Sequence, residues 1–94
     1  MPINTISPEE AVQTLPILSE SARAAAKDGG KTHTLHRVAD DFRTEVRELV
    51  SIFPGNPKVA AMMTALERDS VTWNSFETIA GHFDALANEL ANAA

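Results

Sequence analysis

Apolar residues recur every three or four positions along most of the chain, which is the spacing of one face of an α-helix. The clearest run predicts a helix over residues 34–53, with the apolar stripe Leu35, Val38, Ala39, Phe42, Val46, Leu49, Val50 and Phe53. Another run predicts a helix that starts at Thr72 or Asn74, with the stripe Phe76, Ile79, Ala80, Phe83, Leu86, Ala87 and Leu90. No segment keeps the period of two that is typical of strands.

The first helical run begins at Ser7-Pro8, where serine can cap a helix and proline suits its first position. It ends at Gly29-Gly30, since glycine favours the end of a helix. Pro16 lies inside this run, lacks an N–H and crowds the preceding turn. We therefore expect the first helix to be kinked or broken near Pro16, with Thr14 capping a restarted segment.

Pro54-Gly55 ends the helix over 34–53, and the chain then restarts at Asn56-Pro57, a cap followed by a favourable first residue. The third helix is short, and its apolar side consists of Val59, Met62, Met63 and Leu66. The pattern as a whole predicts one all-α domain over residues 1–94. We expect a small antiparallel four-helix bundle with short loops, preceded by an extended lead over residues 1–6.

Composition excludes several classes of function. The 94 residues include no cysteine and carry a net charge of −5, with no lysine or arginine after Arg68. Nucleic-acid binding requires a basic surface, and a membrane span requires a long apolar run, so we expect neither partner. Without a signal-peptide pattern the chain is expected to be cytoplasmic, although export that uses no cleaved signal would leave no trace.

The sequence offers no catalytic set and no cofactor motif. Ser75, His82 and Asp84 supply the residue types of a nucleophilic triad. On one helix, however, His82 and Asp84 point about 160° apart and cannot form a hydrogen-bonded pair. The glycines form no phosphate-binding loop. Nothing in the sequence therefore points to an enzyme, and we predict no cofactor.

His33, His36 and Asp40 are the candidate metal ligands. On a continuous helix these three side chains project within about 60° of one another, so two imidazoles and a carboxylate could share one ion. The alternative is a pair of surface histidines near a helix start, and the solvated face favours that interpretation. Asp40 and Arg43 are also spaced to form an ion pair across one helical turn.

The outer side of the last helix, opposite Phe83, is the most informative surface. It carries small and uncharged residues where most exposed helices of this length carry lysine and glutamate, and it includes Gly81, which costs a helix about 1 kcal/mol relative to alanine. Gly81 and Ala85 would allow another backbone to approach closely. The alternatives are a plain uncharged surface, or a groove that residues 1–6 fill. The predicted partner-binding residues are Trp73, Thr78, Gly81, Asp84, Ala85, Asn88 and Glu89.

These observations lead to two functional hypotheses. The first is a small protein–protein interaction module, such as an adaptor, inhibitor or accessory subunit, that docks a helical face on another protein or on a second copy in a homodimer. Trp73 contributes because tryptophan is enriched at the centres of interfaces, although a role in the core or at the helix start is an alternative. The second hypothesis is a helical bundle that binds a metal ion or a small ligand.

Overall fold

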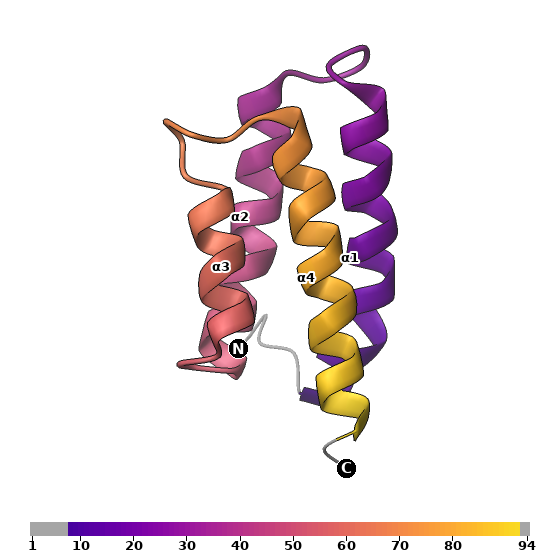
Figure 1. Ribbon diagram of the computed structural model, residues 1–94, viewed down its shortest axis with the longest axis vertical. Coiled ribbons are helices and arrows are strands. Elements are labelled where there is room, and N and C mark those ends of the chain that lie inside the picture. The colour runs from indigo at the N-terminus through magenta and orange to yellow at the C-terminus, as the bar shows by residue number, and fades with distance from the viewer. Residues whose placement is uncertain (1–7, 93–94) are drawn as a thin grey trace, which may run out of the picture.

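The computed structural model describes residues 8–92 and confirms a small all-α bundle of four helices. The helices alternate in direction along the bundle (Figure 1), and short loops join them. Their bounds are α1 Pro8–Asp28, α2 Leu35–Ile52, α3 Pro57–Ala65 and α4 Trp73–Asn92. The predicted lead over 1–6 and the predicted Ser7 cap lie outside the described residues. No helix within 8–92 is both long and apolar enough to cross a lipid bilayer.

Helix α4 lies between α1 and α3 and packs against both, most extensively against α1 (Figure 1). Helix α2 packs on α3 and reaches α4 through Phe42, whose ring centroid lies 5.5 Å from that of Phe76 and 6.4 Å from that of Phe83. Helices α1 and α2 contact each other only slightly. The fully buried large side chains of the core are Leu15, Val46, Leu49, Val59, Met62, Leu66, Phe76, Ile79, Phe83 and Leu86.

The predicted end of α1 and the predicted cap of α3 are both confirmed. Gly29 and Gly30 end α1 with φ of +58° and +94°, a region that L side chains rarely adopt. Asn56 caps α3, because its side-chain oxygen accepts hydrogen bonds from the N–H groups of Lys58 and Val59 at 2.9 and 3.4 Å. These contacts satisfy backbone donors that have no partner within the helix.

Of the two starts predicted for α4, the structure selects the one at Thr72. The N–H of Thr72 donates to the Ser75 hydroxyl at 3.0 Å, and Val71 and Phe76, on either side of this turn, are both buried in the core. The hydrogen bond corresponds to one half of a capping box, and the two buried apolar residues correspond to the hydrophobic staple of a helix start. Ser75 therefore helps to begin a helix.

Of the kink or break predicted near Pro16, the break is wrong, because α1 continues from Pro8 to Asp28 through the proline. Pro16 is exposed, while Leu15 and Ser19 beside it are buried against the rest of the bundle. Packing of the inner side of α1 therefore keeps the helix continuous, although Pro16 cannot donate a backbone hydrogen bond. Thr14 does not cap a restarted helix; its hydroxyl donates to the Glu10 carbonyl one turn earlier, at 2.8 Å.

Replacing Pro16 with alanine should raise the free energy of unfolding by up to about 3 kcal/mol, because alanine restores the backbone donor on a helix that is already continuous. Urea denaturation followed by far-ultraviolet circular dichroism measures the change. Pro57→Ala is the matched control: Pro57 occupies the first turn of α3, where its missing N–H costs nothing, so this variant should gain no stability. Equal stability of Pro16→Ala and the wild type would contradict this account of α1.

Candidate functional site

The candidate site is the outer face of α4, which we define as Asn74, Thr78, Gly81, Ala85 and Asn88. Helix α4 buries its opposite side in the core, where Phe76, Ile79 and Phe83 have no exposed surface. All five residues of the outer face are exposed except Ala85, which is half-buried. None of the five is charged, so this face lacks the lysine and glutamate side chains that normally solvate an exposed helix.

Gly81 has no structural explanation within the described residues. Its φ does not lie in the left-handed region, unlike that of the three loop glycines. A Cβ built at this position would have no neighbouring side chain or helix within 4 Å. Packing inside the bundle therefore does not require a glycine here, although glycine costs a helix interior about 1 kcal/mol relative to alanine.

On the α1 side, Asp84 borders the outer face and is tied to α1. Its carboxylate forms an ion pair with the Arg23 guanidinium, with Oδ2 and Nη2 2.8 Å apart. Both side chains are about half exposed. Arg23 also donates to the hydroxyl of the buried Ser19, which itself donates to the Ala80 carbonyl at 3.3 Å. The nearby Ser19 hydroxyl, and then Arg23, hold the pKa of Asp84 below its ordinary value. Asp84 thus joins α4 to α1.

On the α3 side, Glu89 borders the outer face and is tied to α3. Its carboxylate accepts from the Lys58 ammonium at 2.6 Å and from the Asn56 amide at 2.9 Å. Lys58 is the larger and Asn56 the smaller of the two causes that lower the pKa of Glu89. Because Asn56 is also the cap of α3, Glu89 connects α4 to the start of that helix.

Trp73 lies at the start of α4, on the same side of the helix as Asp84 and about 80° around it from Gly81. Position 73 is rotated about 140° around the helix from Thr78, and the indole packs on Phe76 with ring centroids 5.5 Å apart. A Cβ built on Gly30 would lie only 3.1 Å from the indole, so the ring is also packed against the loop between α1 and α2. The structure therefore gives Trp73 packing contacts at the end of the bundle, on the flank of the outer face of α4 rather than at its centre.

The structure does not bring His33, His36 and Asp40 together. Among residues 8–92, no three histidine, cysteine, aspartate or glutamate side chains gather closely enough to hold a metal ion. His33 precedes the Thr34 cap of α2, so the helical spacing that would align it with His36 does not apply. Asp40 instead forms the predicted ion pair with Arg43.

The side chain of Arg43 is more buried than is usual for an arginine on a solvated helix face. Only 14% of its side chain is exposed, and its Nε donates at 2.8 Å to the carbonyl of Leu66, the residue that ends α3. A cation at this end of a helix offsets the partial negative charge of the last carbonyls. Helical spacing alone could not identify this contact, because its acceptor is a backbone carbonyl on another element.

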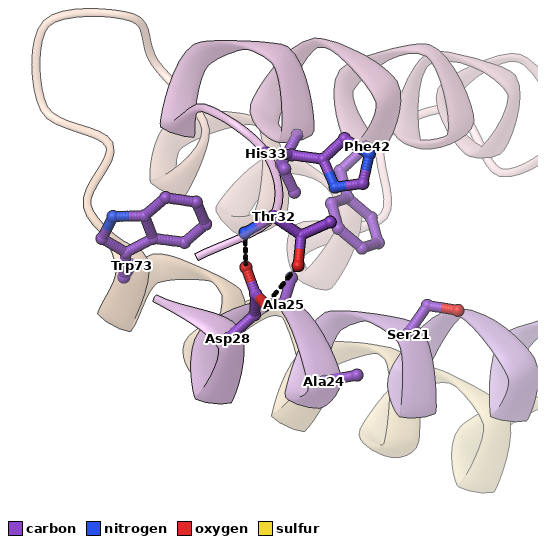
Figure 2. Close-up of a pocket in the computed structure, with 9 residues that line it drawn as sticks. Ser21, Ala24, Ala25, Asp28, Thr32, His33, Phe42 and Trp73 are labelled. Atoms are coloured by element: carbon purple, nitrogen blue, oxygen red, sulfur yellow. Dashed lines mark hydrogen bonds between the residues drawn. The ribbon is translucent and has the colours of Figure 1, made fainter. Parts of the chain in front are cut away.

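Sequence patterns also missed a groove between α1 and α2. Its cavity has a volume of about 340 Å³, and Figure 2 shows Ser21 and Ala24 on α1 across from Phe42 and His33. At one end, Asp28 accepts from the N–H and hydroxyl of Thr32 at 3.1 and 2.9 Å, which lowers the pKa of Asp28 and fixes the loop. The cavity lining consists of Ser21, Ala24, Ala25, Asp28, Thr32, His33, Val38, Phe42 and Trp73.

Comparison with protein-family models, with curated proteins and with solved structures gives no match to this chain. The functional argument therefore rests on the residues and their geometry.

Replacing Asp84 with asparagine should lower the free energy of unfolding at pH 7 by less than about 1 kcal/mol, because the Arg23 ion pair is largely solvated. The folded-state pKa of Asp84 lies below the ordinary 3.8, so its ionised form stabilises the fold above that pH. The deficit should shrink as the pH falls through the lowered folded-state pKa, where the wild type loses this contribution.

Denaturation curves at a series of pH values measure this dependence, with Asp69→Asn on the exposed α3–α4 loop as the control. A deficit for Asp84→Asn that stays constant down to pH 2 would contradict a role for the ionised carboxylate in joining α4 to α1.

Proposed function

We propose that this chain is a small protein–protein interaction module that docks the outer face of α4 against a helix of another protein or of a second copy. The proposal rests on the exposed glycine at position 81. It is exposed within a helix, has an ordinary backbone conformation and has no internal contact that explains the absence of a side chain. An external backbone that packs closely at this position would supply the missing reason.

The surroundings of Gly81 support a helix as the docked element. Packed helices lie about 8–10 Å apart, and small residues at the contact favour the shorter distances. Ala85 follows one turn after Gly81, and Thr78 precedes it by about one turn, so a helix crossing α4 would meet a low, continuous surface. The use of small residues for close approach is best established in membrane helices, and the same steric argument applies in water.

The charged borders of the face support the same proposal. Asp84 and Glu89 are already held by Arg23 and Lys58, so a docking partner would not have to order these side chains from a mobile state. Ordering a long side chain at an interface costs about 0.5–1.5 kcal/mol, and fixing it beforehand avoids that cost. The paired charges then form a polar rim around an uncharged centre, an arrangement that is common in protein interfaces.

For the second hypothesis, no observation favours a metal site, since the described residues hold no suitable cluster. The groove between α1 and α2 lies near the lower end of the usual range for ligand pockets, about 300–1,000 Å³. It is open to solvent, however, and no polar side chain that is fully buried points to a small ligand among its lining residues.

Two substitutions at Gly81 separate the structural and functional roles of the position. Gly81→Ala should raise the free energy of unfolding by about 0.5–1 kcal/mol, because alanine has the higher helix propensity and its methyl group has free space. Gly81→Arg should preserve the helical content and abolish association, since its long side chain would hold a partner's backbone away.

Sedimentation equilibrium measures self-association, and a tagged pull-down from the native host with mass spectrometry and band stoichiometry measures binding to another protein. Ala60→Arg, at an exposed position on α3, is the matched arginine control and should leave association intact. Association that survives Gly81→Arg would remove this face from the proposal.

A further inference from the structure

A second surface, the α1–α2 groove, exists because of how the helices are paired. Helix α1 packs mainly on α4, and α2 reaches α4 through Phe42, so α1 and α2 are left with little direct contact. The residues that line the space between them include Phe42, Ala25, His33 and Trp73 (Figure 2). The groove has two walls, one on each helix.

The α1 wall of the groove is partly apolar, and its charged residues are Asp28 in the groove and Glu20 in the adjoining hollow. Ile17, Ser21 and Ala24 follow one another at spacings of four and three, so they lie along one side of α1. Ile17 is 65% exposed, which makes it the most exposed large hydrophobic side chain among residues 8–92. A second hollow of about 290 Å³ includes Ile17 and shares Ser21 and Ala24 with the groove. This wall therefore offers apolar surface that the bundle itself leaves uncovered.

The α2 wall is mainly acidic, with one cation, Arg37, one turn before Asp41 on the same side. Val38 lines the cavity, and Asp41, Glu45 and Glu48 follow it on the same side of α2, at three, seven and ten residues beyond it. Arg43, which is tied to the end of α3, lies on the opposite side of the helix. None of the three acidic residues has an ion-pair partner among residues 8–92. Partial burial, and then the charge of Glu48, raises the pKa of Glu45.

We propose that the α1–α2 groove binds a cationic amphipathic helix of a partner protein. Leucine-like side chains of that helix would lie over Phe42 and against Ile17 and Ala24. Its lysine or arginine residues would face Asp41, Glu45 and Glu48, where they would relieve the repulsion between carboxylates that have no ion-pair partner among residues 8–92. A helix fits this setting because it satisfies its own backbone hydrogen bonds while its apolar side occupies an apolar groove.

This inference goes beyond the proposed function and does not depend on it. The outer face of α4 is opposite Phe83, whereas Phe42 of α2 packs against the inner side that carries Phe83. The α1–α2 groove and the outer face of α4 therefore lie on different sides of the bundle. Occupation of both would allow this chain to bridge two proteins, and each surface can be disabled by its own substitution.

Trp73 provides a direct test, because it lines the groove and is the only tryptophan in a chain that has no tyrosine. The probe is a synthetic peptide of four helical turns with leucine on one face and lysine on the other. We expect saturable changes in Trp73 fluorescence on titration, with an affinity that falls as salt is added. A peptide with glutamate in place of lysine should give no such change.

Variants of the full chain locate the binding. Glu45→Lys should weaken binding of the lysine peptide by at least about tenfold, because it reverses the central charge of the α2 wall. Asp69→Lys makes the same change in net charge on the α3–α4 loop and should have a much smaller effect. Glu45→Gln, which keeps the shape of the side chain, should weaken binding by an intermediate factor and serves if Glu45→Lys fails to fold. Gly81→Arg should bind the peptide as the wild type does.

Three results would overturn the proposal. The first is the absence of a saturable Trp73 signal with the lysine peptide. The second is an equal loss of affinity in Glu45→Lys and Asp69→Lys, which would indicate attraction to net charge alone. The third is equal binding of the glutamate peptide. Because Gly81→Arg tests only the outer face of α4, failure of the groove proposal is distinguishable from failure of the proposed function.

Discussion

Helices α1 and α4 approach each other closely because small residues occupy much of their contact. Ala11, Ser19 and Ala22 of α1 and Ala80 of α4 are buried there, and the Ser19 hydroxyl donates to the Ala80 carbonyl at 3.3 Å. A buried hydroxyl without a partner would destabilise the fold, so this hydrogen bond also fixes the register of the two helices. The close approach leaves the core to be completed from the other side, by α2 and α3.

The arrangement of the other helices follows from this pair. Helix α3 packs beside α4, and α2 contacts α4 through Phe42, which reaches both Phe76 and Phe83. Helices α1, α2 and α3 cover the side of α4 that carries Phe76 and Phe83, so the outer face around Gly81 stays exposed. Helix α2 also cannot pack closely on α3 and on α1 together, and the groove beside Ile17 and Val38 remains open. The two proposed docking surfaces are thus consequences of one pairing.

Much of the fold could be predicted from the sequence, because caps and apolar stripes act over one or two turns. Asn56-Pro57 and Gly29-Gly30 determine their helix ends through local hydrogen bonds and backbone conformations that neighbouring residues already specify. The break that was one of the two outcomes predicted at Pro16 does not occur, because the buried contacts of Leu15 and Ser19 with distant residues outweigh the local cost of the proline.

The candidate sites were less predictable, because they depend on which helices become neighbours. The exposure of Gly81 follows from the stripe on the opposite side of α4, and the sequence did indicate it. The position of Trp73 against Gly30 depends on how the α1–α2 loop returns to the bundle, and no periodicity contains that information. The α1–α2 groove has the same origin: Val38 belongs to the apolar stripe of α2, and only the pairing of α1 with α4 leaves it at the edge of a cavity.

Native-state hydrogen exchange of the isolated chain tests the central role of the α1–α4 pair most directly, since amide protection reports the free energy of opening for each segment. If the bundle depends on this pair, amides in the inner turns of α1 and α4, around Ser19 and Ala80, should share the highest protection and exchange only through global unfolding. The short helix α3 should have lower protection. If α1 exchanged through a local opening while α2 and α3 stayed protected, the bundle would not depend on this pair, and the account would be contradicted.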